Sequence, residues 1–266
     1  MLSTEESTFL EEGFLSTETQ DAIPGFRDAN ADLFNLAEDV NRLLMRIAHS
    51  AMDTAKTNLQ SKESVAVRLV LRAAGTFQGA VLLAERGLVA DTRTLVRSCL
   101  EDAFALAALI TDPEDFISRY EDDFNGATRR QLKFVTEQKL GDAALHQSLT
   151  DKLNSVPKGG PLNPSDLAKR SPLDVQYLMY QRLSNDSAHP SATSLAHHAY
   201  RHLDKAGWCY SWQVADEETN AATLQIAIQA ILPVAVGIVD FFKIRSFAGT
   251  FEPILERLES LPPRGI

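Results

Sequence analysis

The sequence predicts an all-α protein built as a multi-helix bundle. Two observations indicate this fold class. Apolar residues recur at three- and four-residue spacings along most of the 266 residues, which is the pattern of amphipathic helices. The connections between these stretches are mostly short, as is typical of neighbouring helices in a bundle. A chain of this length can also bury a substantial core.

The first two long helices have clear sequence limits. One is expected over residues 33–51, where the apolar residues follow the helical spacing. A second is expected from about Glu63 to Arg86. Ser61 precedes it as a plausible N-cap, and Gly87 follows it as a plausible stop, because serine can accept a backbone N–H and glycine tolerates the left-handed conformation.

The later helices follow the same pattern. A third is expected over residues 89–110, and Asp112-Pro113 opens a fourth that continues to about Leu140, since proline is tolerated in a first turn. The remaining helices are expected over residues 173–187, 192–203, 216–247 and 250–260.

Three segments depart from this pattern. Residues 155–172 hold four prolines and two glycines and are expected to form a loop or lid. Residues 202–215 form the one segment where a short β pair is expected. The acidic residues 1–26 are expected to precede a single helical domain that spans residues 27–266.

The charge of the chain narrows the range of partners. The formal net charge is −10, and residues 1–63 carry 12 acidic side chains against 5 basic ones. An acidic surface disfavours non-specific capture of a nucleic-acid backbone, so no DNA partner is expected, although a local phosphate site stays open. Cys99 and Cys209 lie far apart among apolar residues, which favours a reducing, cytoplasmic location. The acidic N-terminus is unlike a secretory signal.

One apolar stretch has the length of a membrane span. Ala221–Phe242 is long enough to cross a bilayer, but it contains Gln225, Pro233 and Asp240. These interruptions favour a buried core helix over a span, and no membrane partner is expected.

A charged stripe marks the predicted third helix. Arg93, Arg97 and Glu101 are spaced i, i+4, i+8 and therefore share one face. The rest of that helix is almost entirely apolar, so the stripe is expected to be buried or to face a cleft. One interpretation is an internal Arg97–Glu101 ion pair that braces the bundle. The other is a ligand-binding wall whose arginines face an anion.

A second polar cluster follows the helix predicted over residues 173–187. Arg182 and His189 lie seven residues apart, which is two helical turns. Arginine suits a phosphate, and histidine suits proton transfer near neutral pH. The alternative is a capped helix end followed by a polar turn. The residues between them are polar: Ser184, Asn185, Asp186 and Ser187. Of these, Ser184 and Asn185 are candidate ligand-binding residues.

The histidines do not complete a metal site in the sequence. His198 and His202 have the i, i+4 spacing of a metal-binding pair, but no HExxH motif and no paired Glu-x-x-His motifs are present. No metal ligand is therefore predicted. The glycine-rich nucleotide motifs, the GxSxG elbow and CxxC are also missing, and no cofactor is expected.

Three short motifs resemble a known family. They are Thr92–Glu101, Leu109–Pro113 and the segment from Tyr180 through Leu183-Ser184 to Ala188–Ser191. The chain resembles domain-of-unknown-function family 5677, an uncharacterised bacterial family, over roughly residues 65–245. This resemblance implies no established activity.

Arg182 and His189 also fit the Arg-x(4–6)-His pattern of HEPN domains. That likeness implies an HEPN-like helical core with extra helices, a homodimer, and metal-independent cleavage of RNA in a toxin or defence system. In that family's terms, Arg182 would hold the scissile phosphate, His189 would move the proton of a 2′-hydroxyl, and Asn185 or Asp186 would orient His189. The residue after Arg182 is Leu183, where the family usually has a polar one.

A non-catalytic protein that binds a partner or a small ligand in a polar cleft is the alternative function. It requires only the bundle, the polar stripe and the acidic N-terminal region.

Overall fold

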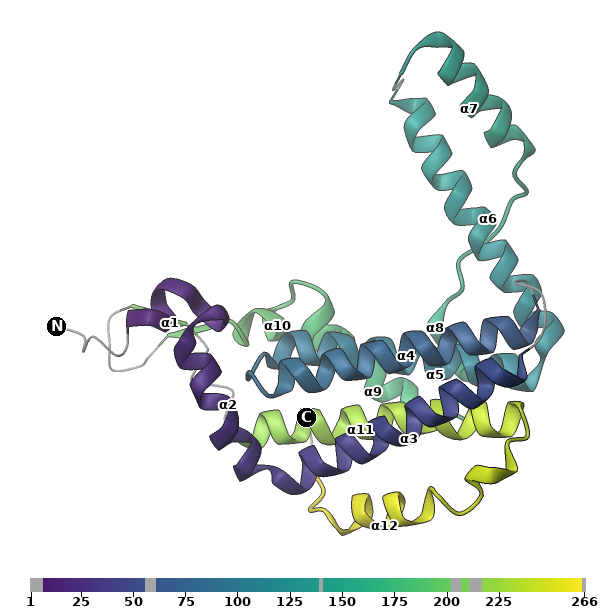
Figure 1. The fold of residues 1–266 in the computed structure, drawn as a ribbon. Helices are drawn as coiled ribbons and strands as arrows, with labels where there is room; N and C mark the ends of the chain where they lie inside the picture. Colours follow the sequence, from purple (N-terminus) through teal and green to yellow (C-terminus); the bar gives the residue numbers. More distant parts are fainter. Residues whose placement is uncertain (1–6, 56–60, 139–140, 202–206, 211–216, 265–266) are drawn as a thin grey trace.

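The computed structural model describes residues 7–55, 61–138, 141–201, 207–210 and 217–264. It confirms an all-α multi-helix bundle, with one short two-stranded ribbon (Figure 1). The elements, in chain order, are α1 (Ser7–Glu12), η1 (Gly13–Leu15), α2 (Thr17–Ala29), α3 (Ala31–Thr54), α4 (Lys62–Ala84), α5 (Val89–Thr111), α6 (Pro113–Glu137), α7 (Ala143–Ser155), α8 (Pro164–Lys169), α9 (Gln176–Leu183), the π-helical turn η2 (Ser184–Ala188), α10 (Ala192–Ala196), β1 (Ala199–Arg201), β2 (Trp208–Tyr210), α11 (Glu217–Phe241), η4 (Arg245–Phe247) and α12 (Glu252–Ser260). The domain division at residue 26, which falls within α2, stays a prediction.

Local capping residues set the limits of the long helices. The Ser61 hydroxyl accepts the Ser64 backbone N–H at 3.2 Å at the start of α4. Gly87 ends the turn after α4 with a φ of +74°. The Asp112 carboxylate accepts the Asp115 N–H at 3.1 Å, directly before the proline that begins α6. These interactions confirm the predicted limits, because each depends on residues adjacent in sequence.

Four long helices form the core. α3, α4, α5 and α11 pack side by side, and α11 contacts the other three (Figure 1). Fully buried aromatic rings fill the space between them, among them Phe34, Phe77 and Phe104.

Two described helices, α4 and α11, are long and apolar enough by composition to cross a membrane. Within the bundle, 72% of the apolar window of α11 is buried, as a core helix requires, against 39% for α4.

A helical hairpin projects from this bundle (Figure 1). We call it the arm; it consists of α6, α7 and the returning chain 156–160. Two glycines allow the returning chain to cross α6 closely. A Cβ on Gly159 would lie 1.8 Å from the Asp122 carbonyl oxygen, and one on Gly126 would lie 2.6 Å from the Gly159 carbonyl oxygen. Any larger residue at these positions would therefore push the hairpin apart.

Two local predictions need correction. The segment 155–172 is not wholly a loop, because α8 forms within it where Pro164 starts a turn and Leu167 and Ala168 are buried. The helix predicted over 192–203 ends at Ala196, and the chain then enters β1. β1 pairs antiparallel with β2, so the β pair expected at 202–215 begins earlier in the chain.

Candidate functional site

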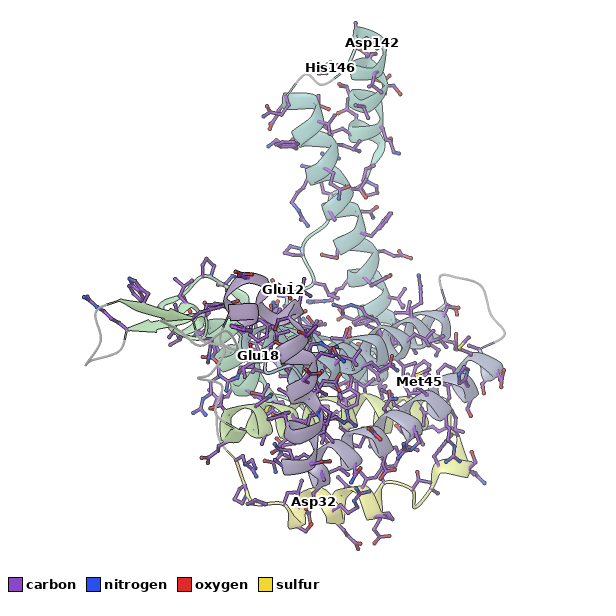
Figure 2. All side chains as sticks on the ribbon, turned by 60° about the vertical axis from the view of Figure 1, so that its left-hand side comes forward. Glu12, Glu18, Asp32, Met45, Asp142 and His146 are labelled. Carbon is purple, nitrogen blue, oxygen red and sulfur yellow. The ribbon has the colours of Figure 1, made fainter. Side chains whose placement is uncertain are left out.

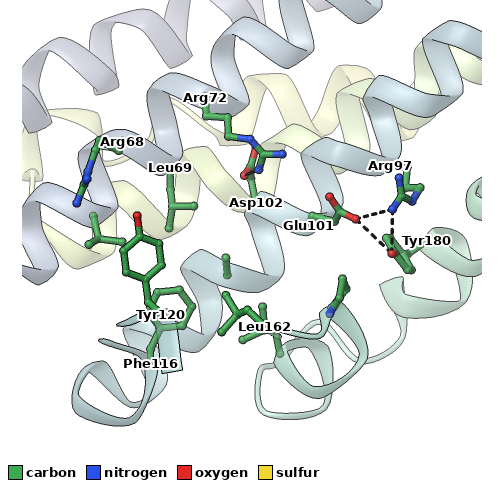
Figure 3. A pocket seen from close by; sticks show the side chains of 14 residues that line it. Arg68, Leu69, Arg72, Arg97, Glu101, Asp102, Phe116, Tyr120, Leu162 and Tyr180 are labelled. Carbon is green, nitrogen blue, oxygen red and sulfur yellow. Dashed lines mark hydrogen bonds and ion pairs between the residues drawn. The ribbon is translucent and has the colours of Figure 1, made fainter. Parts of the chain in front are cut away.

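A cleft of about 460 Å³ opens between α4, α5, the base of α6 and the segment that carries α8 and α9. Drug-sized ligands occupy pockets of roughly 300–1,000 Å³. Its apolar walls include Leu69, Phe116, Leu162 and Leu167. Its polar lining consists of Arg68, Arg72, Arg97, Glu101, Asp102, Tyr120 and Tyr180 (Figure 3). The cleft therefore combines an apolar interior with a ring of charged and hydroxyl groups.

One end of the cleft is closed by an ordered triad. Arg97 donates to Glu101 at 2.8 Å, and the Tyr180 hydroxyl lies 3.2 Å from the same carboxylate oxygen (Figure 3). The Arg97 guanidinium also sits 5.2 Å from the centre of the Tyr180 ring. This is the ion pair that the i, i+4 spacing indicated. Its side chains are 21% and 24% exposed, so it lies in the wall of the cleft and not deep in the core. The Nε atom of Arg97 is buried and has no hydrogen-bond partner among the described residues.

A second ion pair forms the inner wall. Arg72, which is 55% exposed, donates to Asp102, whose side chain is fully buried. Burial raises the pKa of Asp102 to about 7, and the positive charge of Arg72 offsets this effect only in part. The Oδ2 atom of Asp102 has no partner within the described part of the chain. A buried polar atom in this state needs a water molecule or a ligand atom.

The balance of these charges makes the cleft cationic. Three guanidinium groups line it against two carboxyl groups, Glu101 and Asp102, and burial raises the pKa of Asp102. Arg68 and Arg72 are spaced i, i+4 on α4, so both heads lie on the cleft side. Neither arginine was predicted as a site residue from the sequence, nor was Asp102, although the i, i+4 spacing of the arginines on α4 was a signal for them.

Arg93 has a different environment from the rest of its stripe. It is not among the residues that line the cleft, and its side chain is only 7% exposed. It donates to the Asp186 carboxylate in the π-helical turn, and its Nε donates to the Thr223 hydroxyl of α11 at 3.1 Å. The Nε2 atom of His197 lies 3.0 Å from the other Asp186 oxygen. Arg93 thus joins α5 to two distant segments.

The pKa of Asp186 reflects this network. Burial acts to raise the pKa, but the hydrogen bond from His197 and the charge of Arg93 act against it, and the net result is a lowered pKa. Asp186 is therefore held as a carboxylate that neutralises Arg93.

The other predicted site residues surround the π-helical turn, outside the cleft lining. Arg182, near the end of α9, and His189, directly after η2, are both exposed. Asp186 hydrogen-bonds His197 and Arg93, not His189. The backbone carbonyl of Asn185 accepts the Thr193 hydroxyl at 2.8 Å, while the Asn185 side chain is exposed and Ser184 is half-buried. Whether Arg182 and His189 act on one phosphate stays a prediction.

The described residues were expected to hold no metal site, and their His, Cys, Asp and Glu side chains bear on that prediction. Within them, no group of three or more His, Cys, Asp or Glu side chains could hold a metal ion. His202, half of the histidine pair noted in the sequence, lies outside the described residues. Burial raises the pKa of Cys99, so its thiol is not poised to ionise.

The fold and the cleft together define a helical-bundle protein with a cationic, partly apolar cavity of ligand size. The chain belongs to the family of unknown function DUF5677, whose model matches residues 63–206. This match confirms the family resemblance of the three motifs, and the whole cleft lining lies within it. No curated protein and no solved structure matches the chain.

Proposed function

We propose that this protein binds a small amphipathic ligand with an anionic head group in the cleft. The observation that carries the proposal is the lining itself: apolar walls joined to three arginines in one cavity. A ligand of this class gains from burial of its apolar body and from charge-assisted hydrogen bonds to its head.

The two unpartnered buried atoms support this assignment. The Nε–H of Arg97 is a donor that lacks an acceptor in the described protein, and Asp102 Oδ2 lacks a partner as well. A small shift of the Arg97–Glu101–Tyr180 triad would let a carboxylate, phosphate or sulfonate oxygen reach Arg97. Asp102 lines the same cleft, and in its protonated form the carboxyl group is a hydrogen-bond donor.

Calorimetric titration with three ligands tests the proposal. The ligands are octanoate, octyl phosphate and 1-octanol, which all carry an alkyl tail and differ in the head group. We expect the two anions to bind and the alcohol to bind much more weakly. Arg68→Gln should weaken anion binding roughly ten- to hundredfold, the loss that accompanies one charge-assisted hydrogen bond. Ala105→Phe, which fills the cleft without changing charge, should abolish binding.

Arg130→Gln is the matched control, because Arg130 lies on the arm and the substitution removes the same charge. Equal weakening by Arg68→Gln and Arg130→Gln would show that only net charge matters. That result, or equal affinity for octanoate and 1-octanol, would contradict the proposal.

We also propose metal-independent RNA cleavage as a second candidate function. The observation in its favour is that Arg182 and His189 are both exposed on either side of one short turn, where a large substrate could reach them. The HEPN resemblance supports the same pair.

If the pair acts on RNA, His189→Ala should slow cleavage in EDTA by about 10²–10⁴-fold, the usual contribution of general acid–base catalysis. Arg182→Ala should slow it by about 10²–10³-fold, the usual contribution of one electrostatic donor to the transition state. His198→Ala, at another exposed histidine nearby, is the control and should retain activity. Cleavage that survives both substitutions, or no cleavage by the wild type, would exclude this function.

A further inference from the structure

The arm is poorly buried for an element of its length. α6 has 25 residues, and beyond Phe116 at its base only Gly126 is buried; α7 has no buried residue. Figure 2 shows the side chains of the arm standing clear of the bundle, with Asp142 and His146 near its tip. Helices in proteins gain most of their stability from packing an apolar face against other elements, and little of the surface of α6 is packed in this way.

One face of α6 carries a row of regularly spaced residues, which we call the seam: Tyr120, Phe124, Ala127, Gln131 and Phe134. Phe124 and Phe134 are 68% and 61% exposed, and Tyr120, which also lines the cleft at the base of α6, is 38% exposed. With Ala127 and Gln131 they occupy positions separated by four, three, four and three residues. This is the spacing of the contact positions in a coiled coil. The returning chain crosses α6 at Gly126. Phe124, Gln131 and Phe134 of the seam are exposed to solvent, whereas Ala127 is half-buried.

The charges of α6 are unevenly distributed along its length. The first half holds five acidic residues and one basic residue, Arg119, and the second half holds three basic residues and one acidic residue, Glu137. Asp123 and Arg130 lie close to the seam, and seven residues bring them to nearly the same helical angle. The acidic residues of the first half are Glu114, Asp115, Glu121, Asp122 and Asp123, and the basic residues of the second half are Arg129, Arg130 and Lys133.

We propose that the arm is a self-association surface, on which α6 of a second copy of this chain packs antiparallel. A two-fold axis near Ala127 would place the aromatic residues of each copy against the other seam. It would also bring Asp123 of one copy beside Arg130 of the other, twice. Antiparallel pairing sets each acidic half against a basic half, whereas parallel pairing would set like charges together. This inference does not depend on ligand binding in the cleft.

Sedimentation over a concentration series tests the surface with the full chain. We expect the wild type to form a dimer that weakens as salt is raised to about 1 M, where the Debye length falls to about 3 Å. The double variant Phe124→Ser/Phe134→Ser should be monomeric, with unchanged helix content by circular dichroism and unchanged octanoate binding. Leu255→Ser, at an exposed leucine of α12, is the control and should still dimerise.

A charge exchange gives the sharper test. Arg130→Glu and Asp123→Lys should each weaken self-association by more than about tenfold, because each places like charges across the axis. Mixing the two variants should restore a heterodimer, since both cross-axis pairs are then opposite in sign. Asp123 also accepts the Leu162 N–H at 3.0 Å, so Arg130→Glu and the phenylalanine variant provide a test that leaves this contact intact.

Three results would overturn the proposal. The wild type could remain monomeric at every concentration. The dimer could be insensitive to the phenylalanine and charge substitutions, which would locate the interface elsewhere. The arm could instead bind single-stranded RNA through its basic half while the protein stays monomeric, as an electrophoretic assay with Arg130→Glu would reveal.

Discussion

Replacing Asp186 with alanine is expected to lower the free energy of unfolding by about 3–5 kcal/mol. The change leaves the guanidinium of Arg93, only 7% exposed, without its carboxylate partner. A buried pair that loses one member is left with an uncompensated charge, and this costs more than an exposed ion pair contributes. The Thr223 hydroxyl and His197 remain near Arg93, but neither supplies a negative charge.

Urea denaturation of wild type and variant measures this loss. Asp115→Ala is the control, because Asp115 is 41% exposed and pairs with Arg119 and Arg170 at the surface. We expect it to cost no more than about 1 kcal/mol. Because the pKa of Asp186 is lowered in the native state, its contribution is present above the unfolded pKa and is lost as the pH falls through the native value. Equal losses for the two variants would contradict the assignment of a buried network.

The free energy of unfolding is also expected to depend strongly on pH, because of Asp102. Its pKa is raised from 3.8 to about 7, so between these values the native state holds a proton that the unfolded state has released. Stability must therefore fall as the pH rises through this interval. A difference of about three pKa units corresponds to about 4 kcal/mol. Asp102→Asn, which does not ionise, should abolish this part of the pH dependence and should be the more stable form at pH 8.

The difference in unfolding free energy between wild type and Asp102→Asn, measured from pH 4 to pH 8, isolates this group. Glu101→Gln, at the adjacent and 24% exposed carboxyl of the cleft, is the matched control. It should leave most of the wild-type pH dependence of stability in place, because the charge of Glu101 is the smallest contribution to the raised pKa of Asp102. If the unfolding free energy of Asp102→Asn falls with pH as steeply as that of the wild type, the buried carboxyl group does not cause the pH dependence.

The long helices could be predicted because residues adjacent in sequence determine where they begin and end. Ser61 and Asp112 each cap a backbone N–H three residues away, and Gly87 needs only its own conformation. The amphipathic spacing that indicated the helix over 33–51 reports directly on burial, and those apolar residues line the core. α8 was missed because its six residues are helical mainly through packing of Leu167 and Ala168 on α5.

The site depends on distant residues, and so the sequence indicated only part of it. Spacing on α5 predicted the Arg97–Glu101 pair, because both residues lie on one helix. It could not show that Arg93 turns instead toward Asp186, 93 residues away. Nor could it show that Arg72 of α4 meets Asp102, since that contact depends on how two helices pack. The cleft is a product of tertiary structure, whereas its individual helices are products of local sequence.

A crystal structure of the full chain grown with octyl phosphate tests the central claim most directly. We expect the phosphate within hydrogen-bond distance of Arg68, Arg72 or Arg97, with the alkyl chain against Phe116 and Leu162. An apolar groove of about 570 Å³ between α5, α11 and α12 offers a built-in comparison, because it is lined by residues such as Ile110 and Val236 and by no arginine. Octyl phosphate bound in that groove with the cleft empty would contradict the claim.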